Sequence, residues 1–217
     1  IYDYKTDKIN KRKGGIQGPI LLPKYHKKVF LISVIFSMTL LAFSAFTFNP
    51  TNVFATVMLL FFVYSYSAPP LRLKERPPLD SLSNGMMAFF TFLIGYSYNK
   101  TLFDLSSNIY IAAICFAGVH SFTTVSDYAA DRKAKQRTFA VIFGKKAACL
   151  FPGIVFLLAF LLGSFRVSIK YFLLASSMVF FYNSFNPDEK KAEISSKVIF
   201  ILGIITSIIY VFQNSFA

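Results

Sequence analysis

Acidic residues are scarce in this sequence, and charged residues of either sign are uncommon. The 217 residues include 10 Asp and Glu against 23 Lys and Arg, and charged residues make up 15% of the total. Apolar residues, in contrast, make up 55%. A chain of this length can form one or two soluble domains, but so few charges among so many apolar residues point to a polytopic membrane protein.

Cysteine and histidine are also rare, with two residues of each type. Cys115 and Cys149 fall in surroundings too different to suggest a disulfide, and neither forms a zinc-like cluster with His26 or His120. We interpret both cysteines as small apolar residues. The sequence therefore offers no disulfide framework and no cysteine-based metal site.

Seven apolar runs are long enough, or nearly so, to cross the hydrocarbon core, which takes about 17 to 25 helical residues. They predict an all-α fold, a polytopic membrane helical bundle, with residues 1–217 as a single domain. The predicted spans are 28–48, 53–67, 82–98, 108–125, 147–164, 168–184 and 196–213.

Basic residues alternate between the loops. With Lys28 and Lys197 at the span ends counted in, the segment before the first span has 8 Lys and Arg, and the loops after the second, fourth and sixth spans have 3, 6 and 3. The others are Lys100, Arg166 and Lys170. Because basic loops stay on the cytoplasmic side, we expect these loops to face the cytoplasm. The C-terminus is then expected on the opposite, exterior side of the cell (inner) membrane. Cations distributed in this way do not form a nucleic-acid-binding stripe, so no nucleic-acid partner is expected.

Two pairs of aspartates share one spacing. Asp127 and Asp131 follow an apolar run and lie four residues apart, which on a continuing helix places them on one face, one turn apart. Two bare carboxylates there repel each other by a few kcal/mol, so a cation between them would be stabilising. The plain alternative is a solvated helix end with basic neighbours. Asp3 and Asp7 have the same spacing, and both pairs are expected on the cytoplasmic side, so the sequence favours two cation sites that can meet.

The ion that suits such a site is Mg²⁺, which binds one or two carboxylates and takes further oxygen ligands from substrate phosphates. The substrate would then combine a phosphate or diphosphate head with an apolar tail that lies among Phe-rich helices. A prenyl diphosphate fits this description.

A basic, proline-rich loop lies between the second and third predicted spans. Residues 68–78 contain two Pro-Pro pairs, which exclude a helix and favour an extended or polyproline chain. On an extended chain Arg72, Lys74 and Arg76 occupy alternate positions and face one side. We predict a stiff anion clamp, with an ordinary positive-inside loop as the alternative.

His120 is the only ionisable residue well inside a predicted span. We favour a buried neutral histidine that is bonded to a neighbouring helix. A role in the substrate pocket is the alternative, because ionisable residues inside the membrane often mark functional sites.

The chain resembles the UbiA-type membrane prenyltransferase superfamily over essentially its whole length. The first motif of that family is Asn-Asp-x-x-Asp-x-x-x-Asp, and Asp3 and Asp7 match its second and third acidic positions. The second motif, Asp-x-x-x-Asp, matches Asp127 and Asp131. Many members carry a further Asp where this chain has Thr124, so the resemblance implies a metal site with fewer carboxylates.

Longer strings are most similar to the lycopene elongase branch of carotenoid biosynthesis; they are residues 66–77, 80–85 and 118–120. Family members have nine membrane helices, with the two motifs after the second and sixth. The resemblance therefore implies that the intact protein has nine helices around a central prenyl-substrate pocket. It also implies that 1–217 is truncated at its N-terminus and lacks the first helix and most of the second.

The resemblance also implies a reaction in the membrane lipid. Mg²⁺ assists the ionisation of an allylic prenyl diphosphate, and a lipophilic acceptor then attacks the allylic cation. Lycopene is the acceptor expected, with a quinone, chlorophyll or other lipid acceptor as the alternative. An ion-coupled transporter would predict inverted repeats and charges at mid-membrane, which the sequence lacks, and an inactive fragment of an enzyme is a third possibility. The implied site residues are Asp3, Asp7, Asp127 and Asp131 for Mg²⁺, Lys8, Lys13, Arg72 and Lys74 for the diphosphate, and Tyr66 for the allylic cation.

Overall fold

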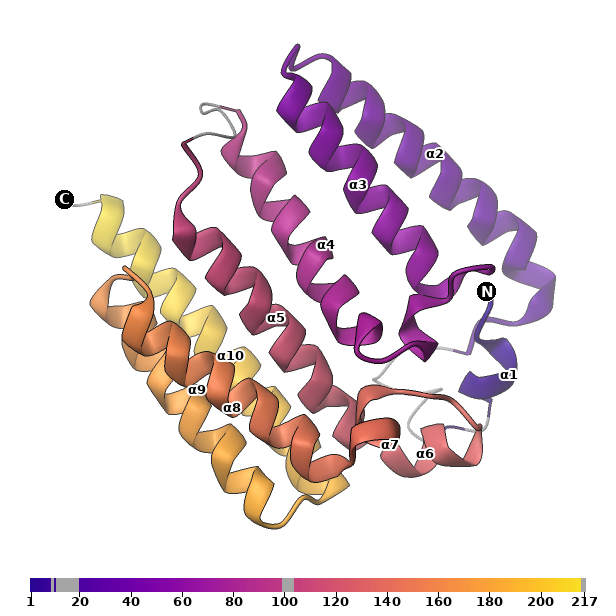
Figure 1. Ribbon diagram of the computed structural model, residues 1–217. Coiled ribbons are helices and arrows are strands. Elements are labelled where there is room, and N and C mark those ends of the chain that lie inside the picture. The colour runs from indigo at the N-terminus through magenta and orange to yellow at the C-terminus, as the bar shows by residue number, and fades with distance from the viewer. Residues whose placement is uncertain (9, 11–19, 99–103, 216–217) are drawn as a thin grey trace.

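The computed structural model describes residues 1–8, 10, 20–98 and 104–215, and the regular structure in them is helical. Each of the seven predicted spans is one long helix (Figure 1). The all-α fold class is therefore confirmed. The seven helices are α2 (His26–Ala45), α3 (Pro50–Ser67), α4 (Leu79–Tyr96), α5 (Ser107–Ser126), α8 (Lys145–Leu162), α9 (Val167–Phe185) and α10 (Glu189–Ser215).

The helix starts follow local capping signals. Asn49 accepts a hydrogen bond from the Thr51 amide at 2.9 Å, and Pro50 occupies the first position of α3. Helix α10 begins at Glu189 rather than at the predicted residue 196, because the Asp188 carboxylate accepts a hydrogen bond from the Lys191 amide at 2.9 Å. This cap extends the helix beyond its apolar part.

Five helices are long and apolar enough to cross a membrane: Pro23–Ala45, Pro50–Ser67, Ser107–Ser126, Lys145–Leu162 and Glu189–Gln213. The first of these includes the short 3₁₀ turn η1 (Pro23–Tyr25) before α2. Helices α4 and α9 are of similar length, 18 and 19 residues, but are not among these five, and both contain polar side chains. Several of these side chains are buried inside the bundle, including Ser81 and Ser83 of α4 and Ser176 and Asn183 of α9.

Successive helices pack side by side through most of the bundle. Contacts run from α2 through α3, α4, α5 and α8 to α9, and α10 packs against both α5 and α9 (Figure 1). Helices α4 and α5 approach closely at Gly85, where an added Cβ would lie 2.7 Å from the Ala113 carbonyl oxygen. The rings of Phe122, Phe156 and Phe180 form the core of the second half, with centroids 4.9 and 5.1 Å apart.

A buried polar network joins α2, α3 and α4. Asn52 is 1% exposed, and its amide nitrogen donates to the Ile94 carbonyl at 3.0 Å and to Ser97 Oγ at 2.9 Å. Its amide oxygen accepts a hydrogen bond from Ser44 Oγ at 2.7 Å. Hydrogen bonds between helices stabilise packing in lipid, where apolar burial contributes little.

The outer helices present apolar side chains outwards. Phe36 of α2 and Phe200 of α10 are both 70% exposed. Such continuous apolar surfaces are typical of contact with membrane lipid. Together with the five apolar helices, they identify an integral membrane protein.

The basic connections gather at one end of the bundle. Figure 1 shows the α3–α4, α5–α8 and α9–α10 connections at the end where the chain starts, whereas the C-terminus lies at the opposite end. The connection between α5 and α8 contains two short helices, α6 (Tyr128–Lys133) and α7 (Phe139–Phe143). The arrangement agrees with the charge pattern; which membrane face this end occupies stays a prediction.

The proline-rich loop differs from the extended chain predicted for it. It turns repeatedly, because the free amides between the two Pro pairs bond to nearby carbonyls: Arg72 to Ala68, Glu75 to Arg72 and Arg76 to Leu73, each at 3.0 Å. Residues Leu73–Glu75 form the 3₁₀ turn η2. The prediction that the three basic side chains face one side was therefore wrong. The Arg76 guanidinium instead bonds back to the Pro70 carbonyl at 3.0 Å.

Candidate active site

The second Asp pair keeps its one-turn spacing although the helix is interrupted. Helix α5 ends at Ser126, and Asp127 forms the junction to α6 with φ −99° and ψ 3°. The Asp131 amide still donates to the Asp127 carbonyl at 2.8 Å, as in a continuous helix. The two carboxylates therefore remain one turn apart.

The first Asp pair repeats this relation. The Asp7 amide donates to the Asp3 carbonyl at 2.8 Å, across the four-residue helix α1 (Tyr4–Asp7). Two segments more than a hundred residues apart in the sequence thus present carboxylates with the same main-chain spacing.

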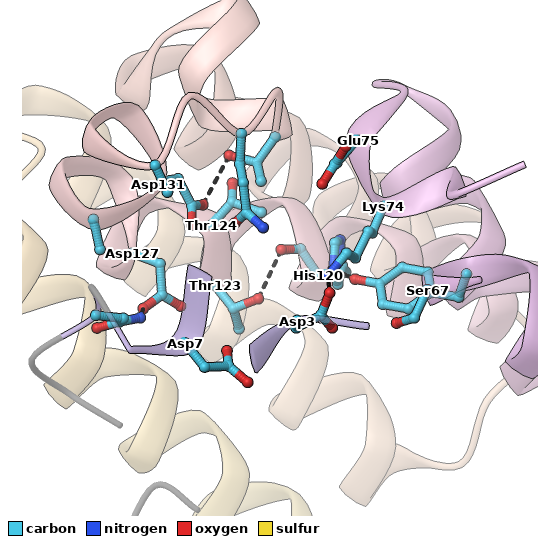
Figure 2. A pocket seen from close by; sticks show the side chains of 16 residues that line it. Asp3, Asp7, Ser67, Lys74, Glu75, His120, Thr123, Thr124, Asp127 and Asp131 are labelled. Atoms are coloured by element: carbon cyan, nitrogen blue, oxygen red, sulfur yellow. Dashed lines mark hydrogen bonds and ion pairs between the residues drawn. The ribbon is translucent and has the colours of Figure 1, made fainter. Parts of the chain in front are cut away.

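Both pairs line one cavity of about 230 Å³ (Figure 2). Figure 2 shows Thr123 between Asp3 and the Asp127–Asp131 pair, and His120 close to Lys74 on the side of Asp3. The structure thus brings together six of the nine site residues that the family resemblance implied: Asp3, Asp7, Tyr66, Lys74, Asp127 and Asp131. The other lining residues are Asn10, Ser67, Glu75, His120, Thr123, Thr124, Ala130, Ala134, Gln136 and Thr138.

Neutral donors orient the second pair. Asn10 Nδ2 donates to Asp127 Oδ1, and Thr138 Oγ1 donates to Asp131 Oδ2, both at 3.0 Å. Asp131 is only 8% exposed. Because these donors carry no charge, they fix the carboxylates without neutralising them.

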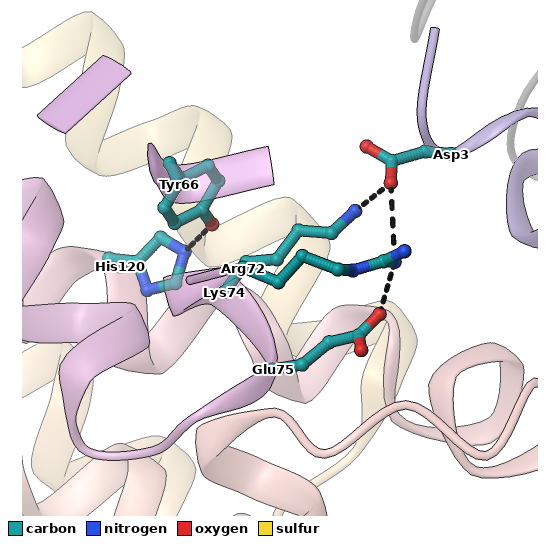
Figure 3. A network of polar contacts seen from close by, with 6 residues as sticks. All are labelled: Asp3, Tyr66, Arg72, Lys74, Glu75 and His120. Atoms are coloured by element: carbon teal, nitrogen blue, oxygen red, sulfur yellow. Dashed lines mark hydrogen bonds and ion pairs between the residues drawn. The ribbon is translucent and has the colours of Figure 1, made fainter. Parts of the chain in front are cut away.

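Basic residues contact the first pair instead (Figure 3). Lys74 Nζ forms an ion pair with Asp3 Oδ1, and an Arg72 amino group lies 3.8 Å from the same oxygen. Arg72 also pairs with Glu75, and its buried Nε has no hydrogen-bond partner among the residues that the structure describes. The loop thus places the side chains of Lys74 and Arg72 beside the cavity, and the Nε–H group of Arg72 makes no hydrogen bond within the described residues.

The remaining predicted phosphate contacts lie elsewhere. The Lys8 side chain is exposed and is not part of the cavity lining. Lys13 lies outside the described residues. Arg72 is not part of the lining and lies between Lys74 and Glu75, which both line the cavity (Figure 3).

His120 combines both roles considered from the sequence. Its Nε2 lies 2.8 Å from Tyr66 Oη on α3, and its Nδ1 lies 3.3 Å from Ser81 Oγ on α4. The histidine is thus bonded to two neighbouring helices, and it also lines the cavity.

Sequence reasoning missed two side chains that position α7. Asp80, which is fully buried, accepts a hydrogen bond from the Phe139 amide at 2.7 Å. Thr124 Oγ1 accepts one from the Ala140 amide at 3.1 Å. The one available signal was Thr124, which stands where many family members carry an acidic residue and here binds the main chain.

The donor set around the cavity suits Mg²⁺ bound together with a phosphate. Among the described residues, no three His, Cys, Asp or Glu side chains are close enough to form a complete metal site. Each Asp pair offers hard carboxylate oxygens, and Mg²⁺ usually binds one or two carboxylates with the remaining ligands from phosphate oxygens and water. Two separated pairs with space between them therefore fit ions that are held jointly by protein and diphosphate.

Comparisons with known proteins agree with this geometry. Residues 1–211 match the UbiA prenyltransferase family. The C(50) beta-cyclic carotenoids biosynthesis protein LbtBC of Dietzia sp. is 28% identical over 169 residues, which are 73% of this chain and 39% of that protein. A lycopene elongase/hydratase of Corynebacterium glutamicum is 31% identical over 163 residues, which are 73% of this chain and 56% of that protein.

A solved structure shares the fold. The UbiA homolog from Archaeoglobus fulgidus bound to DMAPP and Mg²⁺ superposes with a TM-score of 0.65 at 23% identity, covering 94% of this chain and 79% of that one. The helical bundle is thus that of a UbiA-type membrane protein. The chain belongs to the UbiA prenyltransferase family, as its resemblance to the family implied. It spans 39% and 56% of the two curated relatives named above.

Proposed function

We propose that this protein transfers a prenyl group from an allylic prenyl diphosphate to a lipophilic acceptor, a carotenoid such as lycopene. The observation that carries the proposal is the shared cavity, in which two Asp pairs and Lys74 meet at the end of a lipid-exposed helical bundle. A site of this kind suits a substrate with an anionic head and an apolar tail. We place it at the cytoplasmic side of the cell membrane, following the charge pattern.

Mg²⁺ would be held by Asp3, Asp7, Asp127 and Asp131 together with the diphosphate. When bound, it supplies positive charge that stabilises the departing diphosphate. The four carboxylates are the contribution of the protein to that site, and their spacing leaves the phosphate oxygens as the remaining ligands.

The other residues around the cavity have distinct tasks. Lys74, which lines the cavity, binds an oxygen of the diphosphate, and Arg72, which lies beside Asp3 and Glu75, adds positive charge next to it. When the allylic C–O bond breaks, the aromatic ring of Tyr66 stabilises the resulting cation by cation–π attraction. The apolar helices around the cavity exclude water, which would otherwise capture the cation.

A hydrocarbon acceptor is favoured for two reasons. Helices α3, α4 and α5 contain no Lys or Arg, so the described membrane interior offers no cation to hold the carboxylate of an aromatic acid. In addition, the relatives in Dietzia and Corynebacterium are named for carotenoid biosynthesis and for lycopene elongation and hydration.

The experiment that tests the proposal incubates membranes containing the protein with dimethylallyl diphosphate, lycopene and Mg²⁺, with and without EDTA. We expect a prenylated carotenoid that disappears with EDTA and falls a hundredfold or more in Asp127→Asn, which removes one charge from the site. Asp104→Asn is the matched control, because that aspartate is not among the residues that line the cavity. Product that forms undiminished with EDTA would contradict the metal mechanism, and activity on 4-hydroxybenzoate alone would overturn only the acceptor.

A further inference from the structure

Prenyl transfer to a hydrocarbon releases a proton from the acceptor, and some group must bind that proton. The inference that follows rests on the function proposed above. The allylic C–O bond breaks, and the allylic carbon forms a C–C bond with a double bond of the acceptor. The acceptor is left with a carbocation on the neighbouring carbon. A stable alkene forms only when an adjacent C–H bond breaks, so that its electron pair restores a double bond.

The polar face of α5 extends from the Asp pair into the membrane. His120, Thr124, Asp127 and Asp131 are spaced four, three and four residues apart, which keeps them on one face of a helix. Seven residues of helix separate His120 from Asp127, a rise of about 10 Å. A diphosphate bound at the carboxylates therefore points its prenyl carbons towards His120, because the apolar tail has to enter the bundle.

The imidazole is held at both nitrogens. Tyr66 Oη lies 2.8 Å from Nε2, and Ser81 Oγ lies 3.3 Å from Nδ1 (Figure 3). One consistent pattern has the Nδ1 proton donated to Ser81 and the Tyr66 hydroxyl donated to Nε2. Nε2 is then unprotonated and faces a hydroxyl that also lines the cavity.

The other ionisable side chains of the cavity belong to the end of the site that would bind the diphosphate. Asp3 is paired with Lys74, and Glu75 is paired with Arg72. Asp127 and Asp131 accept hydrogen bonds from Asn10 and Thr138, and Asp7 belongs to the first Asp pair. His120 and Tyr66 are thus the titratable pair on the prenyl side of the carboxylates within the described lining.

We propose that Tyr66 and His120 form a relay that accepts the proton released after the new C–C bond forms. The proton leaves the carbon next to the cation and binds the Tyr66 oxygen, while the Tyr66 hydroxyl proton moves to His120 Nε2. The C–H electron pair becomes the new double bond, and the imidazolium retains its Nδ1 proton on Ser81. Position matters more than base strength here, because a carbocation loses a proton to almost any base within reach.

The experiment measures the ratio of products rather than total activity. Membranes with wild type, His120→Gln or Tyr66→Phe are incubated with dimethylallyl diphosphate, lycopene and Mg²⁺. His120→Gln retains a hydrogen-bond acceptor near Nε2 but is not a base, and Tyr66→Phe retains the ring but loses the hydroxyl. We expect the ratio of hydroxylated carotenoid to elongated alkene to rise at least tenfold in both variants, a modest effect for the loss of a general base.

Other outcomes separate this inference from the proposed function. An unchanged ratio in both variants, even with a lower total rate, would mean that His120 is structural or that the departing diphosphate accepts the proton, and would overturn the relay. His26→Gln makes the same chemical change outside the cavity lining and should leave the ratio unchanged. Wild type that consumes no dimethylallyl diphosphate would refute the proposed function itself, and the relay with it.

Discussion

The two Asp pairs have the same main-chain spacing but different neighbours. In both, the second amide donates to the first carbonyl at 2.8 Å. Asp127 and Asp131 follow the 20-residue helix α5 and accept hydrogen bonds from neutral Asn10 and Thr138. Asp3 belongs to the start of a four-residue helix and is paired with a cation, Lys74.

This comparison shows that the sequence motif sets the main-chain spacing of each Asp pair, whereas the neighbouring side chains set the charge around its carboxylates. The hydrogen bonds from Asn10 and Thr138 orient the second pair and add no positive charge to it. An ion pair with Lys74 offsets part of the charge of the first pair. In the reaction that we propose, Lys74 would exchange Asp3 for a diphosphate oxygen, which would couple the first pair to the arrival of the substrate.

The largest loss of activity should come from a substitution in the second Asp pair, and it should exceed the loss from the same substitution in the first pair. We expect Asp131→Asn to lower prenyl transfer a hundredfold or more, because it removes one carboxylate charge from the proposed Mg²⁺ site. Asp3→Asn should cost only about tenfold, because it also releases Lys74 to bind the diphosphate. Single-turnover rates at saturating Mg²⁺ measure both. Equal losses would contradict the distinction between the pairs.

Lys74→Gln should give a smaller effect that falls mainly on one substrate. The variant keeps a hydrogen-bond donor but loses the charge, so KM for the prenyl diphosphate should rise about tenfold, which corresponds to about 1.4 kcal/mol. KM for the carotenoid acceptor should not change, because the acceptor carries no phosphate. Arg76→Gln is the matched control from the same loop, since Arg76 bonds to Pro70 and is not part of the cavity lining. A parallel rise in both KM values would argue for disruption of the loop instead.

Thr138→Val should give the smallest effect and should sharpen the role of neutral donors. It removes the hydroxyl that orients Asp131 while keeping the shape of the side chain, at a cost of about 1 kcal/mol for one hydrogen bond. We expect the Mg²⁺ concentration for half-maximal activity to rise about fivefold. Thr138→Ser, which restores the hydroxyl, should return it to the wild-type value. If serine behaves like valine, packing rather than the hydrogen bond holds Asp131.

Much of the bundle was predictable because apolar runs are a local signal. Each of the seven runs forms a long helix, and the main error was the start of α10, which the Asp188 cap moves to Glu189. The spacing of the two Asp pairs was equally local, since four residues span one helical turn whether or not the helix continues beyond it. The lower hydropathy of α4 and α9 reflects side chains that are buried between helices.

The proline-rich loop shows where local rules fail. Two Pro-Pro pairs do exclude a helix, but the residues between them have amide groups that bond to nearby carbonyls and turn the chain. Arg72 and Lys74 therefore reach Asp3, whereas Arg76 does not. Alternation along an extended chain was the wrong guide, because these turns change the direction of each side chain.

The sequence by itself determined the helical class, the membrane-spanning pattern, the Asp spacing and the family, because each depends on residues that are close together in the chain or on a motif string. Only the tertiary structure decided which side chains meet. Tyr66 and His120 are 54 residues apart, and Asp80 and Phe139 are 59 apart. Such contacts depend on how α3, α4 and α5 pack, and close packing at residues such as Gly85 sets these distances.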